Sequence, residues 1–509
     1  MQTILQCIEH HATNTPDRTF LITPDDNLRV SFTELKSCTN EIGQKLNQLG
    51  IPKGAKVAFL LNNGYWAVNL FLGVMASNRV IVPLNAVAGN VQLTHVLGHS
   101  DSEIVLVAPE YREKLDHLLQ SIERDVLVIE VSENGPQWPS SNTDSIVVET
   151  PVETDTALLL YTSGSTGLPK GAILSHRAIV SGGQNVIVAH ELNSTDRVLC
   201  VLPIYHINGA MVTVVTPLVN GSSVVMPARF SASSFWNLIE SYQCSWSSIV
   251  PTIIKYLLDR ANKEPYKYGD DSRLANFRFA RSASAPLPAV VLKQWEEVFK
   301  VPMIETMGLT ETAATVASNP MPPRQRKPGS VGLPFGNQIN IVDDNGNVCP
   351  ADTIGELVIQ GDNVLDLYYK NPEATASSII DNWLYTGDQG KKDDDGYIFI
   401  TGRLKELIIR GGENIAPREI DDILYKHEAI LEAAAVGVDH EAYGQEVVAC
   451  VVVREGYKCS EAELQTFCEQ SIGKVKTPKT IYFFEDLPKG PSGKILRLKL
   501  PEMIADVNL

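Results

Sequence analysis

The segment Tyr161-Thr162-Ser163-Gly164-Ser165-Thr166-Gly167-Leu168-Pro169-Lys170-Gly171 combines the residue types that hold a phosphate group. Its glycines let backbone N–H groups approach a ligand, its Ser and Thr hydroxyls add donors, and its lysine adds positive charge. It is not a Walker loop, because the lysine does not directly follow a glycine and no Ser or Thr follows the lysine. We predict that it binds phosphate groups through Thr162, Ser163, Gly164, Ser165, Thr166, Gly167 and Lys170.

Other elements that could do chemistry follow this loop in a fixed order. Alone, none is specific: a histidine among apolar residues is more often a core residue, and a Lys-Gly-Pro-Ser-Gly-Lys string is more often a solvated basic turn. Their order is the stronger signal. They are Leu202-Pro203-Ile204-Tyr205-His206, Ser284-Ala285-Pro286-Leu287, Glu305-Thr306-Met307-Gly308-Leu309-Thr310-Glu311, Trp383-Leu384-Tyr385-Thr386-Gly387-Asp388, Gly402-Arg403-Leu404-Lys405-Glu406, Arg410-Gly411-Gly412-Glu413-Asn414-Ile415 and Pro488-Lys489-Gly490-Pro491-Ser492-Gly493-Lys494-Ile495.

This ordered set resembles the adenylate-forming superfamily of acyl-CoA synthetases, luciferases and peptide-synthetase adenylation domains, and the resemblance covers nearly the whole chain. It implies an α/β fold with a large N-terminal domain and a small mobile C-terminal domain, the active site lying between them. It implies a nucleotide site at Ser284, Ala285, Pro286, Glu305, Thr306, Met307, Gly308, Asp388 and Arg403. Met307 departs from the family pattern, which has Tyr at this position, so a thioether replaces the ring expected beside adenine.

The same resemblance implies the catalytic roles. Thr310 bonds phosphate oxygens, and Glu311 holds Mg²⁺, a hard cation suited to a carboxylate. Lys494 is the catalytic lysine and Lys405 the hinge residue between the domains. The CoA-binding residues are Arg410, Gly411 and Gly412, and the substrate-pocket residues are His206, Asn208, Gly209 and Ser282.

Apolar β-branched runs alternate with amphipathic stretches in the first half, which indicates βαβ units and a largely parallel sheet. We expect strands at 56–61, 80–82, 104–107, 126–129, 157–161, 197–201, 222–226 and 247–250, with helices at 32–49 and 65–75. Residues 133–155 read as a surface loop and 261–274 as a polar insertion. A small β subdomain is expected after Pro320. The domains are predicted as 1–402 and 403–509, the second with a helix at 417–426.

The bulk composition limits the partners. The formal net charge of -17 over 509 residues gives no overall attraction for nucleic acid or an anionic membrane. The longest apolar stretches fall short of the ~20 residues that span a bilayer. The eight cysteines are scattered without a Cys-x-x-Cys pair, which favours reduced thiols and a cytoplasmic protein. No oligomeric state is indicated.

Together, the residues and the resemblance predict an AMP-forming acid–thiol ligase that uses ATP and Mg²⁺ and transfers its acyl group to coenzyme A, as in fatty acid metabolism. One alternative loads a carrier-protein phosphopantetheine; another is a non-enzymatic ATP-binding regulator, which retention of the catalytic residues disfavours. The middle of the chain, including Arg281-Ser282-Ala283-Ser284, resembles oxalyl-CoA synthetases. That group has His where Asn208 and Ala314 stand, so oxalate itself is not expected, and a small or medium acid with a polar group remains open.

Overall fold

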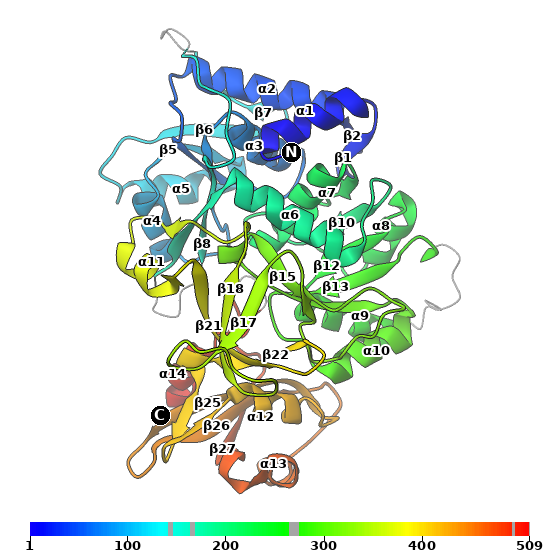
Figure 1. The fold of residues 1–509 in the computed structure, drawn as a ribbon, viewed down its shortest axis with the longest axis vertical. Helices are drawn as coiled ribbons and strands as arrows, with labels where there is room; N and C mark the ends of the chain where they lie inside the picture. Colours follow the sequence, from blue (N-terminus) through cyan, green and yellow to red (C-terminus); the bar gives the residue numbers. More distant parts are fainter. Residues whose placement is uncertain (141–145, 163–167, 264–273, 491–493, 508–509) are drawn as a thin grey trace.

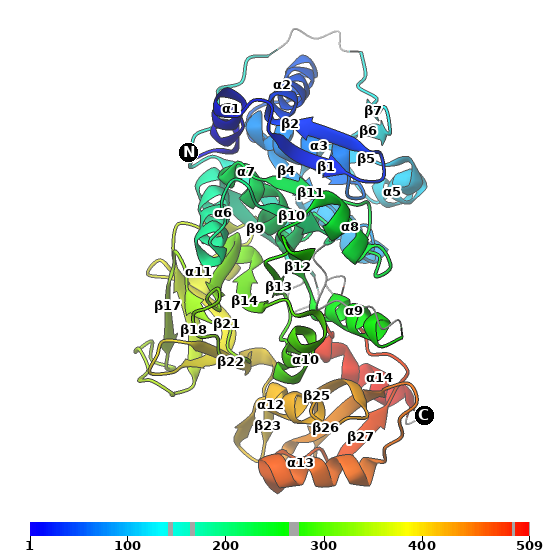
Figure 2. The ribbon, with the colours of Figure 1, turned by 90° about the vertical axis from the view of Figure 1, so that its right-hand side faces the viewer.

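The computed structural model describes residues 1–140, 146–162, 168–263, 274–490 and 494–507 (Figure 1). Five of the residues predicted to bind phosphate, Ser163, Gly164, Ser165, Thr166 and Gly167, lie outside this part of the chain. The two termini lie at opposite ends of an elongated molecule, and the C-terminal elements form a separate lobe (Figures 1 and 2). The fold is α/β, with a large N-terminal domain and a smaller C-terminal domain, as the resemblance implied.

Two sheets dominate the large domain. In the first sheet, the parallel strands β10, β11, β12, β13 and β14 form the centre. Every residue of Trp246–Ile249 is buried, as is typical of a parallel strand that is covered on both faces. The strands of this sheet, in spatial order, are β16 (Leu333–Pro334), β15 (Ala314–Ser318), β14 (Met303–Leu309), β13 (Phe279–Ser282), β12 (Trp246–Ile249), β10 (Arg197–Cys200), β11 (Ser223–Val225), β1 (Thr19–Thr23) and β2 (Leu28–Ser31).

The second sheet also has a parallel centre, formed by β8, β4, β3, β5 and β6, with antiparallel strands at its edges. The parallel centres of these two sheets confirm the βαβ organisation predicted for the large domain. In spatial order its strands are β19 (Leu367–Tyr368), β9 (Lys170–Ser175), β8 (Thr156–Thr162), β4 (Val80–Pro83), β3 (Lys56–Leu60), β5 (Ser102–Val107), β6 (Leu127–Ser132) and β7 (Gly135–Pro136).

Local sequence explains where the helices begin. Ser31 and Glu34 form a reciprocal capping box at the start of α2 (Phe32–Gln48), and Ser175 caps α6 (His176–His190). The other described helices of the large domain are α1 (Ile4–Asn14), α3 (Tyr65–Ala76), α4 (Asn90–His99), the short turn η1 (Pro109–Tyr111), α5 (Arg112–Leu119), the π-helical segment η2 (Asn208–Val215), α7 (Thr216–Asn220), α8 (Phe235–Tyr242), α9 (Pro251–Lys263), α10 (Ala289–Phe299), the short turn η4 (Thr310–Thr312) and α11 (Pro372–Ser378).

A small antiparallel sheet joins the two domains, as expected for the chain after Pro320. It pairs β17 (Gln338–Val342), β18 (Gly355–Gln360), β21 (Trp383–Lys392), β20 (Ile379–Ile380) and β22 (Ile398–Arg403). The chain then passes through the short 3₁₀ turn η5 (Leu404–Glu406). The C-terminal domain contains β23 (Ile408–Arg410), β24 (Glu413–Ile415), α12 (Pro417–Leu424), β25 (Ile430–His440), β26 (Gly444–Val453), α13 (Glu461–Lys476), β27 (Thr480–Phe483) and α14 (Leu500–Val507).

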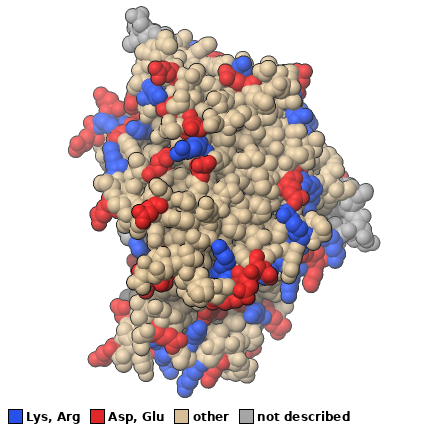
Figure 3. Space-filling view, in the orientation of Figure 1, with Lys and Arg blue, Asp and Glu red and all other residues tan. Residues whose placement is uncertain are grey.

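Two local expectations were wrong. The interval 133–155 contains the short strand β7, because residues 135–136 pair with β6. Residues 261–263 belong to the end of α9, since Ala261 is buried in the core with Leu257 and Leu258. On the face shown in Figure 3, basic and acidic side chains are interspersed, so the net negative charge does not form one continuous acidic surface there.

Candidate active site

A cavity of about 300 Å³ lies where the two domains meet. Its wall combines the end of β13, strand β14, the joining sheet and the C-terminal domain. The predicted site residues that line it are Ser282, Ser284, Ala285, Pro286, Glu305, Thr306, Met307, Gly308, Asp388, Arg403 and Lys494. Among the described residues, the predicted positions His206, Asn208, Gly209, Lys170, Thr310 and Glu311 are not part of this lining.

Asp388 and Arg403 form an ion pair inside the cavity wall. They are direct neighbours on the antiparallel strands β21 and β22, and the Nε of Arg403 donates to the Oδ1 of Asp388 at 2.8 Å. Burial raises the pKa of Asp388, while the charge of Arg403 opposes that rise. The pair therefore places a charged carboxylate and a cation side by side at the edge of the cavity.

Lys494 reaches the same place from the C-terminal domain. Its ammonium lies close enough to Asp388, Arg403 and Glu406 for their charges to act on it. Burial lowers the pKa of Lys494 and Arg403 adds to this effect, whereas Glu406 and Asp388 oppose it. In this domain arrangement the predicted catalytic lysine therefore faces the cavity beside the predicted ribose contacts.

Glu311 and Lys170 are connected through a tyrosine that the sequence reasoning missed. Strands β8 and β9 pair Thr162 with Lys170, so the two described ends of the predicted phosphate loop lie next to each other. The Nζ of Lys170 lies 5.4 Å from the centre of the Tyr368 ring, and the Tyr368 hydroxyl donates to Glu311 Oε1 at 2.9 Å. The aromatic run after Leu367 was the signal that could have indicated Tyr368.

Asn208, one of the predicted substrate-pocket residues, forms a hydrogen-bonded polar group with Ser248 and Ser284 at the start of η2. Ser248 donates to Asn208 Oδ1 at 2.8 Å, and Asn208 Nδ2 donates to Ser284 Oγ at 3.3 Å. Asn208 is buried, so these bonds satisfy an amide that would otherwise be costly to bury. A Cβ on Gly209 would lie 2.3 Å from the carbonyl oxygen of Pro203, so packing requires glycine there.

His206 immediately precedes this polar group and is half-buried. Its ring centre lies 4.8 Å from that of Tyr205, and its carbonyl accepts from Ala210 at 2.9 Å, which begins the helical path of η2. Thr310 and Glu311 lie in the short turn η4, directly after β14.

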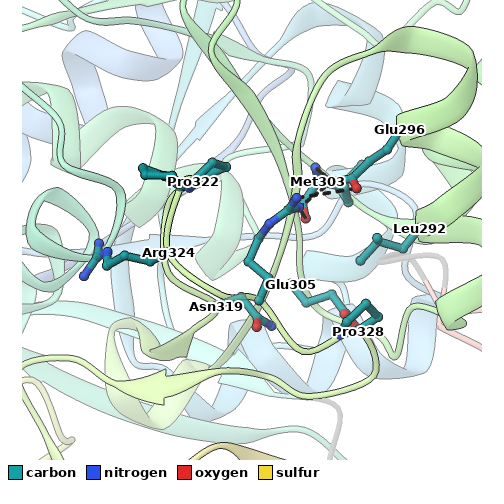
Figure 4. A pocket seen from close by; sticks show the side chains of 10 residues that line it. Leu292, Glu296, Met303, Glu305, Asn319, Pro322, Arg324 and Pro328 are labelled. Atoms are coloured by element: carbon teal, nitrogen blue, oxygen red, sulfur yellow. Dashed lines mark hydrogen bonds and ion pairs between the residues drawn. The ribbon is translucent and has the colours of Figure 1, made fainter.

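Glu305 separates the interdomain cavity from a smaller pocket of about 210 Å³, which Figure 4 shows. The smaller pocket lies between α10, represented by Leu292 and Glu296, and the segment that contains Pro322 and Arg324. Burial raises the pKa of Glu305 to about 7, although Gly329 donates its N–H to the carboxylate at 2.9 Å. Glu305 is therefore a carboxyl group of the cavity wall with a pKa raised close to neutral pH.

The predicted CoA-binding residues lie outside the cavity in this arrangement. Gly411 and Gly412 form the turn between β23 and β24, with φ of 59° and 85°, a backbone conformation that glycine adopts without strain. Arg410 lies over the Tyr443 ring at 4.6 Å and pairs with Glu446. Lys405 is exposed in η5, at the point where the chain enters the C-terminal domain.

Strand β14 shows why two neighbouring predicted residues differ in their tolerance to change. A Cβ on Gly308 would lie 2.0 Å from the carbonyl oxygen of Ala314 on the paired strand, so glycine is required by close packing. Met307 is 9% exposed and packs with Val316 and Ala317 while still lining the cavity. A flexible thioether thus occupies the wall where a ring was expected.

The fold and this interdomain site define the class of the protein. Residues 8–369 match the family described as AMP-binding enzyme, and residues 419–494 match the AMP-binding enzyme C-terminal domain. The chain belongs to the AMP-binding enzyme family. The predicted adenylate-forming resemblance is confirmed.

Relatives over nearly the full length narrow the class. The chain is 43% identical to the sulfoacetate–CoA ligase of Cupriavidus necator, covering 98% of this chain and 97% of that protein. It is 34% identical to the oxalate–CoA ligase of Arabidopsis thaliana, covering 97% of each. The structure of O-succinylbenzoate CoA synthetase from Bacillus subtilis in complex with ATP and magnesium ion matches with a TM-score of 0.85 and 28% identity, covering 97% of this chain and 99% of that one.

These similarities confirm the predicted activity. The chain is an AMP-forming acyl-CoA synthetase that uses ATP, Mg²⁺ and coenzyme A with a small carboxylic acid. The relatives are CoA ligases by name and give no support to the carrier-loading alternative. Within the described part of the chain, no helix has the length and apolar character needed to cross a membrane.

Proposed function

We propose that the enzyme activates a short carboxylic acid that carries a second anionic group, such as a second carboxylate or a sulfonate. The observation that carries this proposal is the 43% identity, over nearly the whole chain, to a ligase named for sulfoacetate. Two other relatives are named for oxalate and O-succinylbenzoate, and each of these acids likewise has a second acidic group. The polar group of Asn208, Ser248 and Ser284 supports a polar rather than a purely apolar acid pocket.

The reaction would begin when a carboxylate oxygen attacks the α-phosphorus of ATP, forming the acyl-adenylate while pyrophosphate leaves. Negative charge gathers on oxygens in this transition state, so catalysis depends on positioned cations. Lys494 would lie between the attacking carboxylate and the α-phosphate, with Asp388 and Arg403 holding the ribose. Their placement around one cavity supports these roles.

Glu311 is our proposed magnesium ligand, and the residues around it fit a hard cation. Its carboxylate and the neighbouring Thr310 hydroxyl are oxygen donors, and Tyr368 fixes one carboxylate oxygen. The described residues hold no group of three His, Cys, Asp or Glu that could bind a metal, so ATP phosphates and water would complete the ligand set. When bound, the ion would neutralise phosphate charge.

The second half-reaction would require a domain rotation. The CoA thiol, losing its proton, would attack the acyl carbon, forming the thioester and releasing AMP. We propose domains 1–402 and 403–509 with Lys405 as the hinge. The position of Arg410, Gly411 and Gly412 outside the cavity supports this proposal, because these residues could approach the adenylate only after the C-terminal domain turns.

A panel of acids tests the proposed substrate class. The wild-type enzyme is assayed for pyrophosphate release and CoA thioester formation with oxalate, malonate and sulfoacetate, and with acetate, propionate and butyrate as monoanionic controls. We expect the highest kcat/KM among the dianionic acids. Higher kcat/KM for every monoanionic control would contradict the proposal.

A further inference from the structure

Among the residues that the structure describes, two arginines are fully buried, and they differ in how many of their nitrogens have hydrogen-bond partners. Arg79 and Arg281 are each 1% exposed. In Arg79 all three nitrogens donate: Nε to Ile51 at 3.2 Å, Nη1 to Ser77 at 2.7 Å and Nη2 to Asn47 at 2.7 Å. In Arg281 only Nη2 donates, to Thr306 Oγ1 at 2.5 Å, and Nε and Nη1 have no partner.

The register of the sheet places Arg281 among the predicted substrate-pocket residues. It lies on β13, paired with Ser248 on β12 and Ile304 on β14, and directly paired residues share one face of a sheet. Thr306, two residues after Ile304, is on that same face. Ser248 is bonded to Asn208 of η2, so η2 covers the face that Arg281 occupies.

Arg281 also stands directly behind the cavity wall. Thr306 and Ser282 line the cavity of about 300 Å³, and Nη2 of Arg281 bonds to Thr306. The Ser282 hydroxyl has no partner of its own. Thr306, which lines the cavity and accepts from Arg281, therefore connects the guanidinium to the space that an acid would occupy.

Burying a guanidinium with two unused hydrogen-bond donors lowers the stability of the folded protein. A buried charge normally has an opposite charge and saturated hydrogen bonds, because desolvation is otherwise uncompensated. No carboxylate of the described residues lies within ion-pair distance of Arg281. Burial lowers the pKa of Arg281 to about 9, which still leaves it protonated at neutral pH.

We propose that Arg281 is a specificity residue that supplies the positive charge for the second anionic group of the acid. Thr306, Asn208 and Ser248 provide the neutral polar surroundings of that group. The inference rests on the proposed substrate class and adds the charge that selects it. A monoanionic acid would leave Arg281 without an ion-pair partner, whereas the second carboxylate or sulfonate of a dianionic acid would pair with it.

The test compares Arg281→Met with Arg79→Met, which removes an equally buried guanidinium whose hydrogen-bond partners do not line the cavity. Each variant is assayed with malonate and sulfoacetate and with acetate and propionate. We expect Arg281→Met to lower kcat/KM for the dianionic acids on the order of 10²-fold, with the monoanionic values changed only a few-fold. Its Tm should stay the same or rise, because an unpaired buried charge is removed. Arg79→Met should lower the Tm and preserve the acid preference.

An unchanged preference for dianionic acids in folded Arg281→Met would overturn the role of Arg281 while leaving the proposed substrate class intact. A wild-type enzyme without that preference would reject both. If Arg281→Met does not fold, a second test uses the wild-type enzyme. Malonate or sulfoacetate should raise its Tm at concentrations where acetate does not. Equal Tm shifts for the dianionic and monoanionic acids would then overturn the proposal.

Discussion

Lys255 of α9 and Glu432 of β25 form an ion pair between the two domains, with 3.2 Å between Nζ and Oε1. Glu432 is 7% exposed and also pairs at 2.8 Å with Lys489, which precedes Lys494 by five residues in the sequence. Helices α9 and α10 lie on the side of the large domain that faces the C-terminal domain (Figure 2). The Lys255–Glu432 pair therefore belongs to the arrangement in which Lys494 faces the cavity.

Glu432→Gln should weaken this arrangement, because Glu432 lines the cavity but is not one of the residues proposed to bind ATP, Mg²⁺ or the acid. If the arrangement in which Lys494 faces the cavity loses about 1 kcal/mol of stability, adenylate formation should slow several-fold. Thioester formation from preformed adenylate should be unchanged or faster. The two half-reactions are measured separately. The control is Glu455→Gln, which removes the Lys263–Glu455 pair at the other end of α9, where both side chains are largely exposed. Equal slowing by both substitutions would rule out a specific role for Glu432.

The contact between Tyr368 and Glu311 predicts a graded series. Glu311→Gln keeps the shape but removes the charge, and a loss of roughly 2–4 kcal/mol of transition-state stabilisation is expected. Tyr368→Phe removes only the hydroxyl that donates to Glu311 at 2.9 Å, so it should raise the Mg²⁺ concentration needed for half-maximal rate with a smaller loss of rate. Pyrophosphate release is measured across a Mg²⁺ titration. Wild-type behaviour of Glu311→Gln at saturating Mg²⁺ would exclude the carboxylate as the ligand.

Glu305 predicts a pH dependence of stability. Its folded pKa of about 7 lies above the ordinary value of 4.5, so the folded state binds a proton that the unfolded state has released between these pH values. Its contribution is therefore fully present below about pH 4.5 and lost as the pH rises through 7, a difference of roughly 2–4 kcal/mol. Glu305→Gln should remove this dependence.

The measurement for Glu305 is the Tm of the wild type and Glu305→Gln at pH 5.5 and 8.5. The Tm of the variant relative to the wild type should increase from the lower to the higher pH. Because Glu305 lines the cavity, ATP is omitted so that nucleotide binding does not contribute. A constant difference between the two proteins across this range would show that Glu305 does not titrate there.

Much of the site could be predicted because its parts are local strings. Asp388 and Arg403 each lie in a recognisable motif, and the strand register then makes them neighbours. Tyr368 and Arg281 could not be assigned roles in the same way. The first acts through a hydroxyl contact to a residue 57 positions away, and the significance of the second lies in its burial and its unused donors. Such properties depend on long-range packing, which a periodic pattern does not specify. The roles assigned to the motif residues stay predictions.

Lys494 and Lys405 should separate the two half-reactions. Lys494 lies in the cavity beside Asp388 and Arg403, so Lys494→Ala should slow adenylate formation by a factor on the order of 10²–10³, as for the loss of one preorganised charge donor. Thioester formation from preformed adenylate should survive, because the domain rotation would remove this loop from the cavity. Lys405→Pro should fix φ near −65° in η5 and restrict the hinge, sparing adenylate formation and slowing the thioester step. Pyrophosphate release and thioester formation are assayed separately for each variant, with Tm as the control for folding. Equal losses in both assays for a folded Lys494→Ala would refute the alternation of domains and indicate one fixed site for both steps.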